Sequence, residues 1–151
     1  MNAADLESVV RKLADRDAIR DLACRYAHLV WQGNGREMAE LFSEDGWMDT
    51  GLEDPIHGRG ALAAAFERLV DPQTDLQPFV HNHVIDLAGD RATGTAYIDL
   101  RSVQDARSMI GSGFYEDEYI RTAGGWRFAS RRLTLRFLVP LAEGWAGRPR
   151  V

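Results

Sequence analysis

Hydrophobic residues in the first part of the chain recur with helical spacing. Over residues 16–31 they form one stripe with a period of about 3.6 residues, which predicts an amphipathic helix. Asp15 or Asp17 is placed to cap its start, and Gly33 to end it. The stripe consists of Ile19, Leu22, Ala23, Tyr26 and Val30.

Three shorter helices are predicted around this one, over residues 5–14, 35–42 and 60–70. Asn34 is a suitable cap for the second, and Asp71-Pro72 ends the third because the residue before a proline disfavours helical geometry. Between them, "SEDGWMDTG" interrupts the helical pattern and predicts a short strand around Trp47.

The second half of the chain has the composition and alternation of β-strands. Four runs, over residues 79–87, 91–103, 109–121 and 126–139, are separated by the turn segments Gly89-Asp90, "QDARS" and "AGG". Strands joined by short turns pair antiparallel. Helices followed by a meander of strands indicate an α+β fold, with the helices on one face of a curved sheet.

The last run changes its hydrophobic face part-way along. Trp126 and Phe128 share parity with Arg132, whereas Leu133 and Leu135 have the opposite parity. A β-bulge near Arg131-Arg132 would explain the change. A sheet buried on both faces, by helices on one side and a second subunit on the other, would also explain it. We favour the second explanation, so we expect a homodimer formed through the sheet.

Composition limits the classes of function. The 151 residues are 45% hydrophobic and carry a formal net charge of −5, which suits one domain over residues 1–151. The charges are interspersed without a basic stripe, so we expect no nucleic-acid and no membrane partner. The single cysteine, Cys24, and an N-terminus without the pattern of a secretory signal favour a buried thiol in a cytoplasmic protein.

The layout resembles the SnoaL-like branch of the nuclear transport factor 2-like superfamily along nearly the whole chain. The resemblance is carried, in order, by "AIRDLACRYAHLV", "MAELFSEDGWMDTG", "HGRGAL", "NHVIDLAGDRATGTAYI" and "YEDEYIRTAGGWRFASRRLTLRF". It implies a cone-shaped antiparallel sheet wrapped around a cavity that takes a small apolar or aromatic molecule. Members include scytalone dehydratase, bile acid 7α-dehydratase, a dehydrochlorinase, polyketide cyclases and ketosteroid isomerase.

Dehydratase-like members use an Asp near the end of the long helix and a His early in the first long strand as a base. The resemblance places Trp31 at the position of the Asp and Pro78 at that of the His, so this chain lacks both. The assisting tyrosine is matched by Tyr26. We therefore do not transfer the dehydratase mechanism, and we retain Tyr26 as a catalytic candidate.

The pair His81 and His83 has the parity of one strand face, since side chains alternate. The resemblance places Asn82 on the face that lines the cavity, so both histidines are expected to point toward an interface or solvent. No third ligand at suitable spacing accompanies them, so a metal site is not predicted.

Two charged residues and several aromatic ones complete the candidate site. Arg132 shares parity with Trp126 and Phe128, so we expect it to be buried, either in an ion pair or as a clamp for a carboxylate or enolate. Asp99, Glu116 and Asp117 are possible partners, and Asp99 is our candidate for a buried base. Trp31, Trp47 and Phe114, together with Asn82, are candidates for the ligand-binding lining.

The sequence thus predicts a small-molecule-binding protein that needs no cofactor. One reading is an isomerase, cyclase, hydrolase or lyase acting on a hydrophobic carbonyl or aromatic compound. The alternative is a non-catalytic binding or interaction module of the same fold, because a shared fold does not fix the function.

Overall fold

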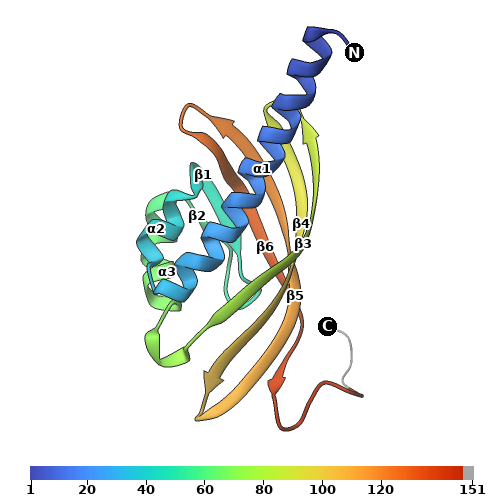
Figure 1. The fold of residues 1–151 in the computed structure, drawn as a ribbon. Helices are drawn as coiled ribbons and strands as arrows, with labels where there is room; N and C mark the ends of the chain where they lie inside the picture. Colours follow the sequence, from blue (N-terminus) through green and yellow to red (C-terminus); the bar gives the residue numbers. More distant parts are fainter. Residues whose placement is uncertain (148–151) are drawn as a thin grey trace.

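The computed structural model describes residues 1–147 and shows helices packed against one curved sheet (Figure 1). The helices are α1 (Ala3–Gln32), α2 (Gly35–Glu40) and α3 (Arg59–Leu69), with a 3-10 turn, η1 (Pro72–Thr74). The strands are β1 (Phe42–Asp49), β2 (Ile56–His57), β3 (Gln77–Ala88), β4 (Arg91–Gln104), β5 (Arg107–Thr122) and β6 (Gly125–Pro140).

The sheet is mixed and open, with the strand order β2-β1-β6-β5-β4-β3. The four long strands pair antiparallel as the turn segments predict, and β1 joins the sheet by pairing parallel to β6. The α+β prediction is therefore confirmed. We call the face covered by the helices the inner face and the opposite one the outer face.

Helix α1 is one continuous element, so the prediction of two helices over 5–14 and 16–31 was wrong. Asn2 caps its start through a reciprocal pair with Asp5, and Gly33 ends it with a φ of 66°. Asp15 does not cap a helix; it is buried within α1, where it accepts hydrogen bonds from Arg121 and from Trp126 Nε1. These bonds fix the middle of α1 to the end of β5 and the start of β6.

The change of face in β6 comes from β-bulges. Phe128 pairs with Tyr119 and Ser130 with Glu118, so Ala129 is an extra residue that rotates everything after it to the other face. The preferred explanation, burial of the sheet on both faces, is thus not what produces the pattern. A second irregularity at Arg136 places Leu135 and Phe137 on opposite faces.

The core lies between the inner face and the helices. It combines the predicted stripe of α1 with Met38 of α2, Phe66 of α3 and inward residues of the sheet such as Phe42, Ile98 and Phe128. Cys24 is exposed rather than buried, because it lies outside that stripe. Among the described residues, no helix is long and apolar enough to cross a membrane.

Candidate functional site

A buried ion pair lies on the inner face, between β5 and β6. Arg131 is 0% exposed and donates from Nε to Asp117 Oδ1 at 2.8 Å and from Nη2 to Asp117 Oδ2 at 2.9 Å. The two residues face each other in the strand register, so β5 and β6 bring them together directly. Buried charges persist when they are paired and hydrogen-bonded in this way.

Aromatic rings enclose the guanidinium group. The Arg131 Cζ atom lies 3.8 Å from the centre of the Tyr115 ring, 4.2 Å from Phe128 and 4.5 Å from Tyr26. The Tyr26 ring, in turn, makes edge contacts with the rings of Phe42 and Phe66. The cluster is thus a desolvated aromatic box around a single cation.

One donor in this box has no partner. Arg131 Nη1 is buried and makes no hydrogen bond to the described part of the protein. Buried polar atoms in native proteins are nearly always paired, with protein, water or ligand. The Tyr26 hydroxyl is also weakly held, since it donates only to Met48 Sδ, at 3.3 Å.

A hydrogen-bonded chain leads from the ion pair to the edge strand β3. Tyr119 Oη donates to Asp117 Oδ2 at 2.8 Å, and His83 Nε2 lies 2.9 Å from the same hydroxyl. Because the Tyr119 proton is directed to the carboxylate, His83 is placed to donate from Nε2, which leaves Nδ1 as an acceptor. His83 is half-buried, so the chain joins a partly accessible imidazole to a fully buried carboxylate.

Burial sets the protonation states of these groups. It lowers the pKa of His83, although Asp117 acts in the opposite direction, so the imidazole is neutral at pH 7. Burial raises the pKa values of Tyr26, Tyr115 and Tyr119, so all three keep their protons. Burial alone would lower the pKa of Arg131, but Asp117 outweighs it and the guanidinium stays charged.

The structure places the two predicted charged residues elsewhere. Arg132 is on the outer face, with its side chain 53% exposed, and pairs with Asp49 at 3.3 Å. The expectation that it is buried was wrong because the bulge at Ala129 turns Arg131, rather than Arg132, inward. Asp99 is also exposed, 3.0 Å from His81 Nε2, so it is not a buried base. Neither residue is brought close to Tyr26.

The two histidines do not share a face. Val80 pairs with Ile98 and His83 with Ala96, so an extra residue at His81-Asn82 reverses the parity of β3. His83 therefore points inward to Tyr119, whereas His81 is exposed and bonded to Asp99. Asn82 lies in the bulge and is exposed, rather than lining a cavity.

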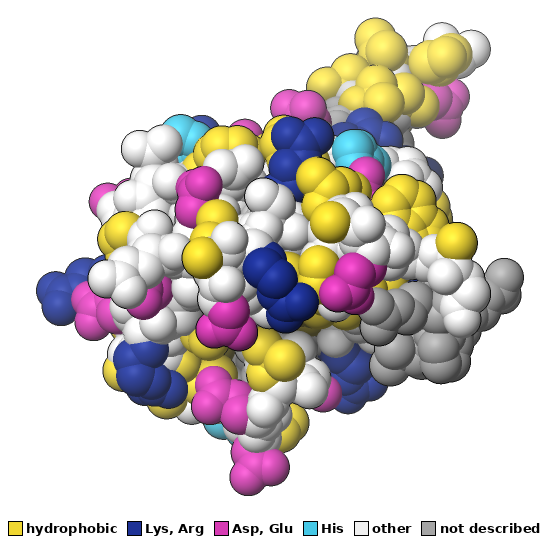
Figure 2. All heavy atoms as spheres, turned by 90° about the horizontal axis from the view of Figure 1, so that it is seen from below, with side chains coloured by type: hydrophobic (Ala, Val, Ile, Leu, Met, Phe, Trp, Pro, Cys, Tyr) yellow, Lys and Arg dark blue, Asp and Glu magenta, His cyan; other side chains and the backbone are white. Residues whose placement is uncertain are grey.

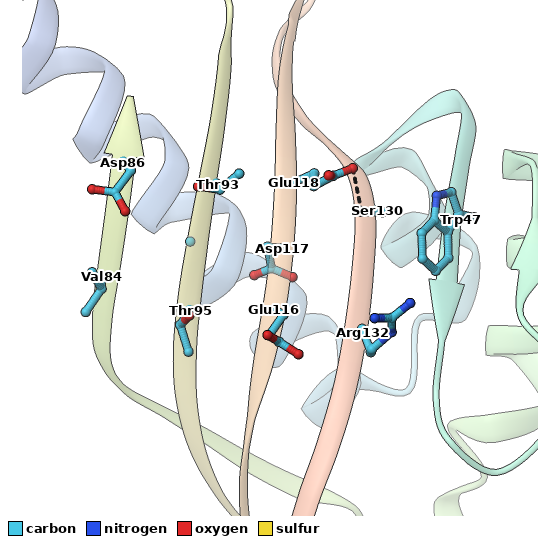
Figure 3. Close-up of a pocket in the computed structure, with 11 residues that line it drawn as sticks. Trp47, Val84, Asp86, Thr93, Thr95, Glu116, Asp117, Glu118, Ser130 and Arg132 are labelled. Carbon is cyan, nitrogen blue, oxygen red and sulfur yellow. Dashed lines mark hydrogen bonds between the residues drawn. The ribbon is translucent and has the colours of Figure 1, made fainter. Parts of the chain in front are cut away.

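Two predicted lining residues also lie outside the box. Phe114 is on the outer face, beside the ring of Tyr97. Trp47 and Arg132 border an outer-face groove of about 360 Å³, shown in Figure 3, whose other walls include Glu116, Glu118 and Thr95. In that view, α1 lies behind the sheet and the groove is open toward the viewer.

The surface pockets do not reach the aromatic rings of the box. Four pockets in the described part of the chain have linings without Tyr26, Tyr115 or Arg131, and Asp117 borders the outer-face groove. One of them, of about 390 Å³, contains the His81–Asp99 pair between Phe79 and Trp145. Within residues 1–147, no group of three or more His, Cys, Asp or Glu side chains is arranged to hold a metal ion.

Comparison with protein families places residues 11–132 in the family described as the SnoaL-like domain. The chain belongs to this family. Its fold agrees with that of solved structures: a Mycobacterium tuberculosis protein of unknown function is 30% identical, with 92% of this chain and 79% of that one covered and a TM-score of 0.73.

Two further structures come from Novosphingobium. An NTF2-like protein with a cystatin-like fold from N. aromaticivorans is 24% identical over 97% of this chain and 95% of that one, with a TM-score of 0.78. A hexachlorocyclohexane dehydrochlorinase, LinA-type3, from N. barchaimii is 21% identical over 94% and 97%, with a TM-score of 0.79. A comparison with curated proteins gave no significant match.

The two positions that the SnoaL-like resemblance assigns to an Asp–His dyad do meet in this chain. Trp31 Nε1 donates to the backbone oxygen of Pro78 at 2.8 Å, and its ring contacts Phe79 edge-on. The fold thus preserves the neighbourhood of the two positions, but an indole and a proline fill them. These side chains supply no base.

The sequence singled out Asp117 only as a possible partner of Arg132, and it did not single out Tyr115, Tyr119 or Arg131 as site residues. A signal was present in "YEDEY", where Tyr115, Asp117 and Tyr119 alternate with Glu116 and Glu118. Period-2 alternation puts the first three on one face and the two glutamates on the other. Because Asp117 is the middle one of three consecutive acidic residues, its burial was not predicted from the sequence.

Proposed function

We propose that this SnoaL-like protein binds a small, largely apolar molecule whose carbonyl oxygen accepts a hydrogen bond from Arg131 Nη1. The unpartnered, buried Nη1 donor carries this proposal. A carbonyl oxygen of a ligand would satisfy it, and the rings of Tyr26, Tyr115 and Phe128 would contact the apolar remainder.

The charge balance favours a neutral oxygen. Asp117 already compensates the positive charge of Arg131, with both of its oxygens accepting hydrogen bonds. A ligand carboxylate would add an uncompensated negative charge in a desolvated site, which is unfavourable. A ketone, aldehyde, ester or enol adds none.

Access to the box requires a side chain to move. Tyr26 is the best candidate, because its hydroxyl is held only by the weak acceptor Met48 Sδ. Rotation of Tyr26 would free space next to Arg131 and bring a second donor to the same ligand oxygen. Two donors converging on one carbonyl would stabilise an enolate as well as a ketone.

A catalytic role is favoured by the chain His83–Tyr119–Asp117. A neutral imidazole linked through Tyr119 to a buried carboxylate can accept a proton at Nδ1, and Asp117 would stabilise the resulting imidazolium. This arrangement suits a cofactor-independent isomerase, cyclase, hydrolase or lyase acting on a hydrophobic carbonyl or aromatic compound.

A binding role without catalysis is favoured by Trp31 and Pro78, which occupy the positions of the family's dyad. The two roles share the ligand class and differ in turnover. Incubation of the protein with a ligand that stabilises it, followed by liquid chromatography and mass spectrometry of the recovered ligand, separates them, because an isomerised ligand keeps its mass but changes its retention time.

The ligand class is tested by thermal-shift screening with steroids, terpenoids and aromatic polyketides. We expect neutral carbonyl compounds to raise the Tm, and Tyr26→Phe to reduce the effect. Tyr97→Phe is the matched control, because it removes the hydroxyl group of an exposed tyrosine on the outer face. A carbonyl ligand that stabilises the control and Tyr26→Phe to the same extent as the wild type, or a failure of all neutral carbonyl compounds, would refute the assignment.

The expected homodimer through the sheet remains a proposal. It is supported by hydrophobic side chains that are exposed on the outer face, namely Val84 and Tyr97. Tyr97→Arg should then increase the monomer fraction measured by light scattering after gel filtration.

A further inference from the structure

Helix α1 extends well beyond the body of the protein (Figure 1). Every residue from Met1 to Ala14 is exposed, and Asp15 is the first buried residue of the helix. At about 1.5 Å per residue, the segment from Ala3 to Ala14 projects about 18 Å. The reciprocal cap between Asn2 and Asp5 stabilises the far end of the segment as helix.

The projecting segment carries a hydrophobic stripe, which we call the N-terminal stripe. Figure 2 shows hydrophobic side chains gathered on the part that stands out from the body. The spacing is that of one helix face. The stripe consists of Leu6, Val9, Val10 and Leu13, which are 55%, 43%, 54% and 61% exposed.

The N-terminal stripe faces away from the core of its own chain. Leu6, Val10 and Leu13 each precede a buried residue of α1 (Asp15, Ile19 and Leu22) by nine positions, which is about two and a half helical turns. Most of the stripe is therefore turned away from the buried face of α1, and Val9, which lies five full turns before the buried Ala27, forms the edge nearest to that face. Its own sheet is not positioned to cover this stripe.

The charges along the segment are arranged to match a second copy running in the opposite direction. The acids Asp5 and Glu7 come first, and the bases Arg11 and Lys12 follow. In an antiparallel pair centred between Val9 and Val10, Leu6 faces the partner's Leu13 and Val9 faces the partner's Val10. Each flank of one helix then lies beside the same flank of the other. Glu7, which pairs with Arg11 of its own helix at 3.3 Å, therefore also lies near the partner's Arg11, and Asp5 lies near the partner's Lys12. A two-fold pair makes each of these contacts twice.

The length of the segment fits the same register. Asp15, where α1 enters the body, would lie opposite residue 4 of the partner, so the two projecting segments overlap along their full length and end at the two bodies. We infer that the N-terminal stripe is a self-association surface that binds the same segment of a second copy of this chain in antiparallel orientation. This inference is independent of the proposed ligand.

The contact is small, so a weak and concentration-dependent association is expected. Two segments of about three turns bury less than the ~1,200 Å² of a standard stable interface. Sedimentation velocity of the full chain over a range of concentrations should show a concentration-dependent association step, which starts from the monomer or, where the sheet dimer forms, from that dimer. Leu6→Ser with Leu13→Ser should remove it, while circular dichroism and Tm stay unchanged, because neither side chain contacts the core.

Charge reversal tests the orientation. Glu7→Lys and Arg11→Glu should each weaken self-association about tenfold, because each turns two attractive contacts between the chains into repulsive ones. Both variants also lose the Glu7–Arg11 ion pair within the helix, so circular dichroism of the dilute monomer is compared for the two. Mixing the two variants should restore association as a heterodimer, since Glu7 and the partner's Arg11 lie on the same flank only in the antiparallel orientation. Glu37→Lys is the matched control, with the same charge change at an exposed site on α2.

Three results would overturn the inference. The first is a wild type that stays monomeric at the highest concentration, or that loses association only in the outer-face variant Tyr97→Arg. The second is an equal effect of Glu37→Lys and Glu7→Lys, or no recovery on mixing. The third is binding of the monomer to phosphatidylcholine–phosphatidylglycerol vesicles that the Leu6→Ser, Leu13→Ser variant loses, which would assign the stripe to a lipid surface.

Discussion

Single side chains determine the chemistry of the inner face, and a shift of one position decides whether an arginine is buried there, as Arg131 shows. It differs from Arg132 by one position, yet one is enclosed by three rings and the other pairs with Asp49 in solvent contact. The pair Arg131–Asp117 holds the centre of the box, and Tyr119 extends it to His83.

Removing one member of the buried Arg131–Asp117 pair should lower the free energy of unfolding far more than removing both. Arg131→Met leaves the Asp117 carboxylate buried without its partner, at an expected cost of about 3–5 kcal/mol in the free energy of unfolding. Arg131→Met combined with Asp117→Leu should recover most of that loss. Urea unfolding measures both, and equal destabilisation by the single and double changes would contradict the account.

His83 should make folding stability depend on pH near neutrality. Because its pKa is lowered on folding, the unfolded chain binds more protons, so stability is full above the ordinary histidine pKa and falls as pH drops through it. His83→Gln should flatten this part of the curve of unfolding free energy against pH. Replacement of the exposed His28 by Gln is the control, expected to leave the slope as it is.

At the scale of elements, α1 is held to the sheet mainly at its middle. Arg121 donates twice to Asp15 at 2.8 Å, Trp126 Nε1 donates once at 2.9 Å, and Arg16 Nη1 reaches the backbone oxygen of Ile85. The Arg121 hydrogen bonds lower the pKa of Asp15, and Trp126 adds to the effect. The three bonds to Asp15 join residues more than a hundred positions apart in the chain, and the Arg16–Ile85 bond joins residues 69 positions apart.

Asp15→Asn should therefore lower the free energy of unfolding by about 1–3 kcal/mol, since it weakens a charged hydrogen-bond centre. The loss should be largest at neutral pH and vanish in acid, because the wild type loses the stabilisation as pH falls through the lowered pKa of Asp15. Asp17→Asn, an exposed change on the same helix, is the control. Parallel pH curves for wild type and Asp15→Asn would count against this role.

The bulge at Ala129 is the second decisive element. Deletion of Ala129 should move Arg132 inward and Arg131 outward, and should turn Leu133 and Leu135 toward solvent. We expect the deleted chain to lose its cooperative thermal transition. Deletion of Glu53, which is exposed in the loop between β1 and β2, changes the length equally outside the paired strands and should be tolerated better.

On the scale of the whole molecule, the body and the projecting part of α1 differ in the interactions that protect their backbone amides from hydrogen exchange. Residues from Asp15 onward pack on the sheet, whereas the segment before it is stabilised by interactions within itself: its helical hydrogen bonds, its cap and the Glu7–Arg11 ion pair. Helices this short are marginal without tertiary contacts.

Hydrogen exchange should show this difference directly. In dilute protein, amides of residues 6–13 should exchange much faster than those of residues 19–30. At high concentration, the inferred pairing should slow the first group and leave the second unchanged. Uniform protection along α1 in dilute protein would mean that the projecting segment packs against its own chain.

The sequence by itself determined the local elements, because hydrophobic period, caps and turn residues act within a few positions of one another. Gly33 ends α1, Asn34 caps α2, and the antiparallel order of the long strands follows from the short turns between them. The resemblance of motifs also indicated the SnoaL-like family, which the match over residues 11–132 shows.

Only the tertiary structure decided which side chains meet. One extra residue in β3 separates His81 from His83, and one in β6 exchanges Arg131 for Arg132 at the centre of the box. A strand bulge reverses every later side chain. The change of hydrophobic face in β6 was compatible with a bulge, but the position of a bulge depends on pairing with a distant strand. For the same reason, two helices were predicted where α1 is continuous. The apolar face of α1 changes near residue 14, and the surfaces that its two halves face belong to other parts of the structure.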